Sequence, residues 1–315
     1  MSDLFEIKNI APMLIRDEVE AFDDPDWMFE LELDGIRSVA YLDKNTNEIK
    51  NKRNMRLSPI LPELDKINKQ VRQRCVLDGE LFVMKNGAPD FEEMQKRTMM
   101  SAPVKIKLAS ERLPVSFVAY DILYYKDKEV MGLPLIERKN LLDKVVKENE
   151  RIAVSRYIEQ EGKALFALTK EQKLEGVVGK RKTSLYYPGK ETKDWVKIKN
   201  MLDDDFVVCG YIYKENNMVS VVLGQYDKKR LVYKGHVTFG VRGDNFKQIK
   251  AVEEIQQPPF DEPIPSGNEE AHWLKPVLVC IVKFMNYTAS GQMRQPVLKG
   301  LRDDKLPTQC KVKKR

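Results

Sequence analysis

The alternation of apolar and polar positions predicts strands in the first part of the chain. Residues 27–33 alternate, the Asp34-Gly35 pair is typical of a tight turn, and residues 37–42 resemble a second strand, so the pattern predicts a hairpin. Other runs predict strands at 75–84, 115–124, 177–178 and 195–199 and helices at 90–98 and 134–148. Because these elements mix without regular βαβ order, we expect an α+β domain of antiparallel sheets.

The pattern changes at the acidic stretch Asp203–Asp205. Three alternating runs follow, separated by turn-forming residues, as in a β-meander. They are 206–213, 218–226 and 230–239. A helix is predicted at 245–255, a proline-rich loop at 258–266, a long strand at 278–288 and a basic tail at 311–315. The simplest interpretation is a five-strand β-barrel with one helix, as in the OB-fold, and we expect two domains, 1–202 and 203–315.

Composition narrows the class of protein. The chain has 315 residues and a formal net charge of +6, which permits phosphate binding without requiring it. Its four cysteines are far apart and form no C-x-x-C pair, which argues against a zinc site and favours a reduced, cytoplasmic protein. Two separated histidines, His236 and His272, make a histidine-based metal site hard to build. No apolar run approaches the roughly 20 residues of a membrane span, so we expect no membrane partner.

Several short motifs combine acidic, basic and aromatic residues. On its own, Asp-Gly-Ile-Arg at 34–37 is most simply a hairpin turn with one surface arginine. The motifs occur in this order: Glu32-Leu-Asp34-Gly-Ile-Arg37, Asn51-Lys-Arg53-Asn, Asp78-Gly-Glu80-Leu, Phe117 with Tyr120-Asp121, Glu175-Gly-Val-Val-Gly-Lys180, Trp195-Val-Lys197-Ile-Lys199 and Arg302-Asp-Asp-Lys305. The ordered set resembles the covalent nucleotidyltransferases, and within them the ATP-dependent DNA ligases. Segments around Tyr186 and Gly291 are most similar to the ligase modules of bacterial end-joining ligases.

The resemblance implies a nucleotidyltransferase (adenylation) domain at 1–202, an OB-fold domain at 203–315, ATP and Mg²⁺ as cofactors, and nicked duplex DNA as partner. By this resemblance the catalytic positions are Glu32, Asp34, Arg37, Lys197 and Lys199. Cofactor contacts are expected from Glu30, Arg37, Arg53, Glu80, Phe117, Glu175, Lys197, Lys199, Arg302 and Lys305, and metal contacts from Glu80 and Glu175. We also expect a monomer that works with DNA-repair proteins.

The residue types suit this chemistry. Lys197 and Lys199 alternate along one strand face, so both side chains point the same way toward a phosphate group. Arg37 and Arg53 offer bidentate forks for phosphate or ribose oxygens. Glu175 provides the carboxylate oxygen that magnesium prefers. Phe117 has two interpretations, a ring that stacks on adenine or a plain core residue.

Glu32 stands where the family carries its nucleophilic lysine. A carboxylate there gives a mixed anhydride that hydrolyses readily, and it repels the nucleotide by roughly 4 kcal/mol at about 4 Å and an effective dielectric near 20. We therefore predict that the chain cannot self-adenylylate at useful rates. Glu32 is either an introduced change or a natural departure, and both explanations stay open. Glu191 and Ile281 are smaller departures, where many relatives carry arginine and glutamate.

The function predicted from these features is a DNA ligase scaffold that seals nicks through enzyme-AMP and DNA-adenylate intermediates, with a defective first step. One alternative is a non-catalytic pseudo-ligase that binds nicks. Another is a capping-type guanylyltransferase, which shares the motifs and the two-domain plan but is disfavoured by the segments around Tyr186 and Gly291.

Overall fold

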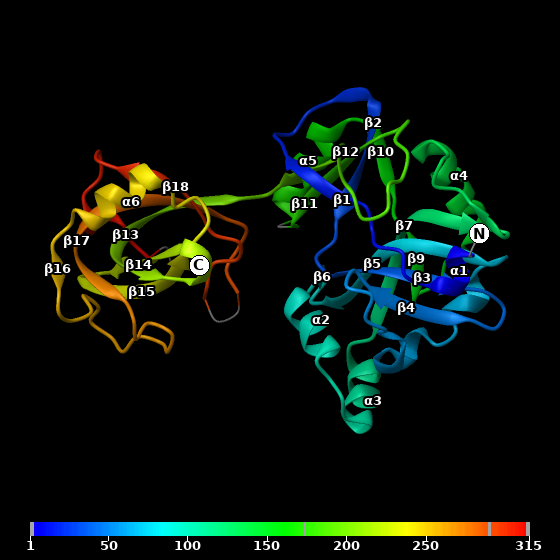
Figure 1. Ribbon diagram of the computed structural model, residues 1–315, viewed down its shortest axis with the longest axis horizontal. Helices are drawn as coiled ribbons and strands as arrows, with labels where there is room; N and C mark the ends of the chain where they lie inside the picture. The colour runs from blue at the N-terminus through cyan, green and yellow to red at the C-terminus, as the bar shows by residue number, and fades with distance from the viewer. Residues whose placement is uncertain (1–2, 173, 289–290, 313–315) are drawn as a thin grey trace. The chain divides into compact units, whose positions relative to one another are not determined.

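The computed structural model describes residues 3–172, 174–288 and 291–312. The chain divides into two compact units, Met1–Asn200 and Met201–Arg315, each with its own hydrophobic core (Figure 1). None of the described helices is long and apolar enough to cross a membrane.

The first unit contains two β-sheets. The five-stranded sheet has the order β1 (Leu14–Glu18), β12 (Glu191–Lys199), β11 (Gly176–Arg181), β2 (Asp24–Glu32) and β10 (Tyr157–Gln160). The seven-stranded sheet has the order β4 (Asn47–Asn51), β3 (Ile36–Leu42), β5 (Cys75–Lys85), β7 (Val115–Tyr125) and β8 (Lys128–Glu129), with β6 (Ala88–Pro89) on β5 and β9 (Ile152–Val154) on β7. All pairings are antiparallel except β1 with β12 and β7 with β9, as expected for an α+β domain.

The helices of this unit flank the two sheets, except α3 (Pro103–Arg112), which packs on the 3₁₀ turn η2 (Pro62–Leu64). The other helices are α1 (Leu4–Ile7), α2 (Phe91–Thr98), α4 (Leu135–Val145) and α5 (Gly162–Glu171), and the other 3₁₀ turns are η1 (Ser58–Ile60) and η3 (Ile67–Gln70). Helix α5 packs on β2 and β11, and α2 packs on β5 (Figure 1). The predicted helices at 90–98 and 134–148 correspond to α2 and α4, whereas α3 and α5 were not predicted.

The two sheets meet through one apolar layer. Met28 of β2, Val39 of β3 and Trp195 of β12 belong to the same buried cluster, so the inner faces of the two sheets look toward each other. Phe29, the neighbour of Met28, points to the opposite face and packs with residues of α5. Because both faces of β2 are covered, alternation along its second half is nearly erased, and Trp27–Glu30 are all buried.

The predicted hairpin at Asp34-Gly35 is wrong. β2 pairs with β10 and β11, while β3 pairs with β4 and β5, so the turn carries the chain from one sheet to the other. A Cβ at Gly35 would lie 2.2 Å from the backbone oxygen of Leu81 and 2.9 Å from Cγ of Glu80. Glycine is therefore required here for close approach to β5. An Asp-Gly pair specifies a tight bend, and it does not require that the flanking strands pair with each other.

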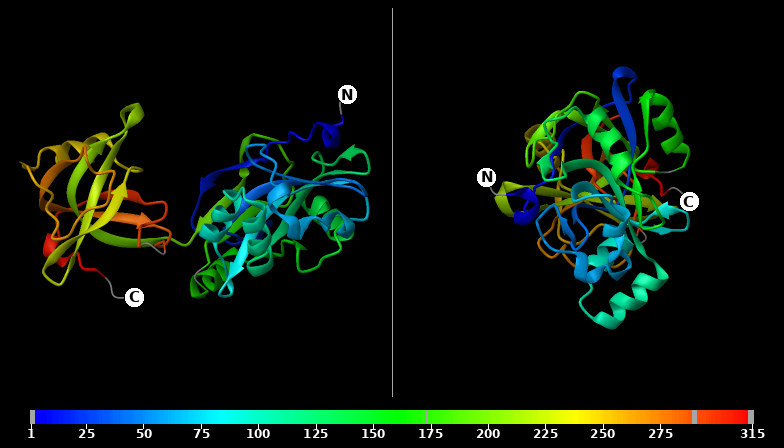
Figure 2. Two further views of the ribbon diagram at one scale, coloured as in Figure 1. Left: turned by 90° about the horizontal axis from the view of Figure 1, so that it is seen from below. Right: turned by 90° about the vertical axis from the view of Figure 1, so that its right-hand side faces the viewer.

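The second unit is a curled six-stranded sheet, visible in Figure 2. Its order is β15 (Arg230–Val237), β14 (Val219–Asp227), β13 (Leu202–Tyr213), β17 (His272–Phe284) and β16 (Glu254–Ile255), with β18 (Val297–Arg302) on β17. The unit also has α6 (Gly243–Lys250), η4 (Glu215–Asn217) and η5 (Pro307–Gln309). A bridge from Phe239, beyond β15, to Val297 of β18 brings the two ends of the sheet together, as in a barrel.

Several predicted boundaries in this unit need correction. The helix predicted at 245–255 ends at Lys250, because residues 254–255 pair with β17 as strand β16. The strand predicted at 278–288 runs from His272 to Phe284 instead. Strand β18 was not predicted as a strand, since its residues were interpreted only as a motif. In the predicted basic tail, Lys313, Lys314 and Arg315 lie outside the described residues.

Candidate active site

The candidate site begins at the end of β2, on the face that looks toward the seven-stranded sheet. Glu30 and Glu32 lie two and four residues beyond Met28, so all three side chains share that inner face. Both glutamates are buried, at 1% and 8% exposure. Buried carboxylates are costly unless cations accompany them, so their partners define the site.

Glu32 forms an ion pair with Lys197 of β12. The Lys197 ammonium donates a hydrogen bond to Oε1 of Glu32, while the buried Oε2 has no hydrogen-bond partner among the described residues. Burial alone would lower the pKa of Lys197, but the carboxylate of Glu32, followed by those of Glu175 and Glu80, raises it above its ordinary value. Lys197 is therefore held in its charged form by an acid at the position where the family resemblance expects a lysine.

Glu175 and Lys199 lie beside this pair. Lys199 is opposite Gly176 in the β11–β12 register, and its Nζ is 3.8 Å from Oε1 of Glu175. The pKa of Glu175 is raised to about 8, first by burial and then by the carboxylates of Glu32 and Asp34, while Lys199 and Lys197 oppose the shift. Near neutral pH the Glu175 carboxyl therefore holds a proton, and a cation placed here would displace it.

The seven-stranded sheet contributes Glu80 and Tyr120. Glu80 lies on β5 and Tyr120 on β7, and the Tyr120 hydroxyl donates a hydrogen bond to Oε2 of Glu80. Burial raises the pKa of Glu80 to about 8, although the hydrogen bond from Tyr120 and the charge of Arg37 act in the other direction. Lys197 also acts on this carboxyl, which shows that the two sheets face one charged cluster.

Arg37 is fixed by a buried carboxylate. Its Nε and Nη2 donate to the two oxygens of Asp78 at 3.0 and 2.6 Å, and Asp78 also accepts from the Tyr186 hydroxyl at 2.8 Å. The guanidinium lies over the rings of Tyr120 and Trp195, at 5.5 and 5.7 Å from their centroids. The Nε–Nη2 edge of Arg37, which binds Asp78, is therefore unavailable to a phosphate unless this pair breaks.

A second charged group surrounds Glu30. Lys139 of α4 and Lys180 of β11 lie 2.7 and 3.1 Å from its Oε1. Burial lowers the pKa of Lys180 to about 8, even though Glu30 opposes the shift. The Lys180 ammonium also lies 4.3 Å from the Trp195 ring and 4.9 Å from the Tyr120 ring.

The structure thus brings together eight of the predicted residues in the first unit, in the ion pairs and charge interactions described above. They are Glu30, Glu32, Asp34, Arg37, Glu80, Glu175, Lys197 and Lys199, and Arg37 belongs to the cluster through its effect on the pKa of Glu80. Sequence reasoning missed Tyr120, Lys139 and Lys180 as site residues. The alternation of side chains along a strand would have placed Tyr120 and Phe117 on opposite faces. No sequence pattern pointed to Lys139, which comes from a helix far along the chain.

Two of the other predicted residues lie elsewhere in the first unit, and two belong to the second unit. Phe117 is fully buried in the core on the other face of β7, so no ring face is open to a base. Arg53 is exposed in the turn that follows β4. Arg302 and Lys305 belong to the second unit, where both bind Asp205.

The carboxylates of the cluster do not form a complete metal site. Among the described residues, no group of three or more histidines, cysteines or acids is placed to hold a metal ion. Magnesium commonly takes only one or two carboxylates and completes its shell with water and substrate phosphates. Glu175 and the unpartnered Oε2 of Glu32 fit that mode, because a hard cation would satisfy both.

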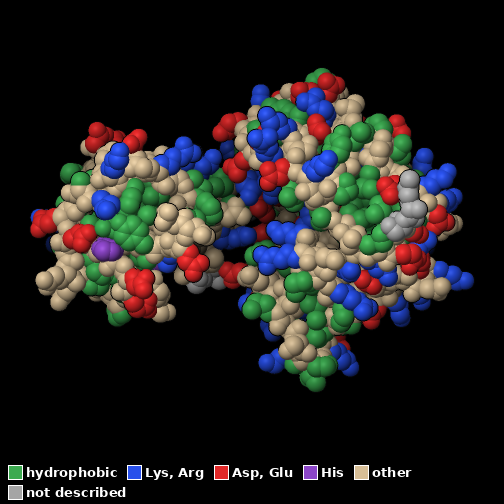
Figure 3. All heavy atoms as spheres, in the orientation of Figure 1, with side chains coloured by type: hydrophobic (Ala, Val, Ile, Leu, Met, Phe, Trp, Pro, Cys, Tyr) green, Lys and Arg blue, Asp and Glu red, His purple; other side chains and the backbone are tan. Residues whose placement is uncertain are grey.

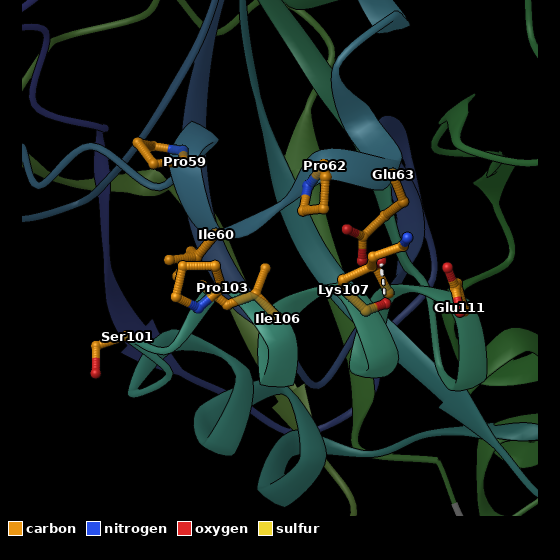
Figure 4. Close-up of a pocket in the computed structure, with 10 residues that line it drawn as sticks. Pro59, Ile60, Pro62, Glu63, Ser101, Pro103, Ile106, Lys107 and Glu111 are labelled. Atoms are coloured by element: carbon orange, nitrogen blue, oxygen red, sulfur yellow. Dashed lines mark hydrogen bonds between the residues drawn. The ribbon is translucent and has the colours of Figure 1, made fainter.

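A separate cavity of about 760 Å³ lies between η1–η2 and α3 (Figure 4). Pro59, Ile60 and Pro62 form one wall, and Pro103 and Ile106 of α3 form the other. None of the predicted site residues lines it, so the cavity is not part of the charged cluster.

Comparison with known proteins identifies the class. Residues 11–199 match the family model of the ATP dependent DNA ligase domain, and residues 214–305 match that of the ATP dependent DNA ligase C terminal region. The chain therefore belongs to the ATP-dependent DNA ligase family. This confirms the resemblance to the ATP-dependent DNA ligases that the ordered motifs indicated.

Individual relatives support the same assignment. The chain is 28% identical over 317 residues to the multifunctional non-homologous end joining DNA repair protein LigD of Mycobacterium tuberculosis, covering 97% of this chain and 40% of that protein. It is 29% identical over 290 residues to the SPbeta prophage-derived DNA ligase-like protein LigB of Bacillus subtilis, covering 91% of this chain and 97% of that protein. The chain thus spans about two fifths of the LigD relative.

Solved structures agree on the fold. A mycobacterial DNA ligase D complexed with ATP and MES has a TM-score of 0.57 and 27% identity, covering 96% of this chain and 98% of that one. A Lig E DNA ligase, at 16% identity and a TM-score of 0.64, shares the fold alone. The predicted fold class, a nucleotidyltransferase domain followed by an OB-fold, is confirmed.

Proposed function

We propose that this chain is a DNA ligase that seals nicks whose 5′ end already carries AMP, and that it does not load itself from ATP. The observation that carries the proposal is the Glu32–Lys197 ion pair at the centre of a cluster gathered from both sheets. Membership of the ATP-dependent DNA ligase family supports the general reaction, and Glu32 limits which of its steps this chain performs.

The first step requires an uncharged amine that attacks the α-phosphorus of ATP. A carboxylate at position 32 has lower nucleophilicity and forms an unstable anhydride. Lys197 cannot readily replace it, because the neighbouring acids raise the pKa of its ammonium. The enzyme-AMP intermediate is therefore not expected to accumulate.

The later steps need positioning more than a protein nucleophile. Lys197 and Lys199 would contact the phosphate of the adenylylated end, and Glu80 would accept a hydrogen bond from a ribose hydroxyl. Tyr120 offers the aromatic surface for adenine that the buried Phe117 lacks. Magnesium, when held near Glu175 and Glu32, would neutralise phosphate charge. The remaining predicted contacts, from Arg37 and Arg53, require these side chains to move.

Nicked duplex DNA is the proposed substrate. Basic and acidic side chains are interspersed on the face seen in Figure 3, which is consistent with a net charge of only +6. DNA contact on this face would thus rest on local groups and not on one extended basic field. Similarity to the multifunctional non-homologous end joining DNA repair protein LigD also leads us to propose a role in DNA repair. We further propose that the protein acts as a monomer in the cytoplasm.

Two incubations test the proposal. With labelled ATP and Mg²⁺, the unaltered chain should form no covalent AMP adduct. With a pre-adenylylated nick and no ATP, it should join the strands, and a K197A variant should lose that activity. A stable adduct on the unaltered chain would overturn the first half of the proposal, and the absence of sealing would overturn the second.

The absence of sealing combined with tight nick binding would favour the pseudo-ligase alternative. The capping-type guanylyltransferase is tested by titrating ATP and GTP in parallel. Preferential binding of GTP would favour it, although the family assignment supports ATP.

A further inference from the structure

Asp205, on β13 of the second unit, binds both basic residues of the Arg302–Lys305 motif. Nη1 of Arg302 donates to its two carboxylate oxygens at 2.9 and 3.1 Å, and the Lys305 ammonium donates to Oδ2. The Asp205 side chain is only 12% exposed. Burial alone would raise the pKa of Asp205, but the hydrogen bonds from Lys305 and Arg302 hold it below its ordinary value.

The strand register explains why these residues meet. Asp205 is opposite Ile281 on β17, and Ile281 is opposite Gly300 on β18, so the end of β18 carries Arg302 to a position diagonal to Asp205. Gln225 of β14 donates to the backbone oxygen of Asp205 at 3.1 Å and so fixes the strand beneath the carboxylate. The ion pairs are therefore built into the barrel by its pairing.

The motif is electrically balanced as it stands. Asp304 takes the other edge of Arg302, with hydrogen bonds of 2.9 and 2.6 Å to Nε and Nη2. Two cations thus face two carboxylates. A phosphate group presents the same arrangement of oxygens to a guanidinium fork and an ammonium as a carboxylate does, and it carries more charge. It can bind this pair only by displacing a carboxylate.

We infer that Asp205 is an internal counter-ion that occupies Arg302 and Lys305 until the phosphate chain of a nucleotide displaces it. The inference rests on the proposed function, in which the diphosphate bridge between AMP and the 5′ end of the nick is the phosphate partner for these two cations. Asp205 is in this sense a positioning residue: it keeps the two side chains ordered beside β13, and it lowers their affinity for a diphosphate or triphosphate.

Calorimetric titration of inorganic pyrophosphate into the full chain tests this competition. We expect D205N to bind pyrophosphate about tenfold more tightly than the unaltered chain. In D205N pyrophosphate no longer has to displace the two partly exposed ion pairs that Asp205 makes with Arg302 and Lys305. D203N is the matched control, because Asp203 lies on the same strand and its change alters the net charge equally. D205E, which keeps the charge, should resemble the unaltered chain.

The gain in pyrophosphate affinity must depend on Arg302 and Lys305, so the triple variant D205N/R302A/K305A should not show it. An equal gain in D203N, or a gain that survives in the triple variant, overturns the inference. The inference is also overturned if D205N gains affinity for nicked duplex DNA but not for pyrophosphate. If D205N fails to fold, the Arg302 Nε–H resonance of the unaltered chain decides: it must shift as pyrophosphate saturates.

Failure of the proposed function has a different signature. It appears as lack of sealing on a pre-adenylylated nick, whatever the pyrophosphate affinity.

Discussion

Replacing Glu32 tests the electrostatic and the nucleophilic consequences of this residue separately. Glu32→Gln removes the negative charge and keeps the shape, whereas Glu32→Lys also supplies an amine. In both variants Lys197 loses its carboxylate partner and becomes free to contact a phosphate. We expect tighter ATP binding in both variants and a covalent AMP adduct only in Glu32→Lys.

The size of the effect follows from the charges at the site. A carboxylate about 4 Å from one phosphate charge costs roughly 4 kcal/mol at an effective dielectric near 20, or about a thousandfold in affinity. That is an upper limit, because Lys197 already pairs with Glu32 and is 36% exposed to solvent. We therefore expect Glu32→Gln to tighten ATP binding by about tenfold, which corresponds to roughly 1.4 kcal/mol.

The assay combines a fluorescent ATP-binding titration with intact-protein mass spectrometry in Mg²⁺. In Glu32→Lys the ammonium of Lys197 should lower the pKa of the introduced amine and favour its attack. The reasoning is refuted if Glu32→Gln leaves the Kd for ATP unchanged. It is also refuted if Glu32→Lys binds ATP but forms no adduct, because the rest of the cluster would then be unable to support the reaction.

Three further predictions concern neighbouring residues. Burial raises the pKa of Glu80 and Glu175 to about 8, above the unfolded value near 4.5, so protonation of these two carboxyls stabilises the folded state. This stabilisation is lost as the pH rises, and the melting temperature should therefore fall between about pH 5 and pH 8. In the double variant E80Q/E175Q the melting temperature should depend less on pH over the same range. Tyr120→Ala should weaken ATP binding about tenfold through loss of base stacking. Phe117→Ala should lower the free energy of unfolding in urea by about 3–5 kcal/mol and leave the Kd for ATP of the folded protein unchanged. Equal effects of the two variants on the Kd would contradict the assignment of the two rings to opposite faces of β7. Asp78→Asn should cost about 3–5 kcal/mol in the free energy of unfolding, because Arg37 would lose its buried partner, and a loss below about 1 kcal/mol would show that solvent or another acid compensates.

Periodicity predicted β7, α2 and α4 well, since each buries a regular set of side chains, and a continuous apolar run predicted β5, whose first seven residues are all buried. It failed where tertiary pairing decides. The residues flanking Gly35 look like a hairpin locally, and only the close approach to Leu81 shows that they belong to two sheets.

The site was predictable where a motif lies on one strand, as with Lys197 and Lys199. It was less predictable where residues meet across strands or helices. The Glu30–Lys139 contact joins β2 to α4, and the Asp205–Arg302 contact joins residues 97 positions apart. Phe117 and Tyr120 occupy the same short motif, and only their opposite orientation on β7 distinguishes the core residue from the site residue.

The Gly35 crossover also constrains how the first unit can admit a bulky substrate. Residues 33–35 are the entire link between β2 and β3, and three residues span at most about 10 Å. A second link, residues 155–156, joins β9 of the seven-stranded sheet to β10 of the five-stranded sheet, and the Lys139 ammonium donates a hydrogen bond to the backbone oxygen of Ser155 at 3.5 Å. The two sheets are therefore tethered at two places, one next to Glu32 and the other next to Lys139. Motion of one sheet against the other would thus leave the surroundings of both side chains largely unchanged.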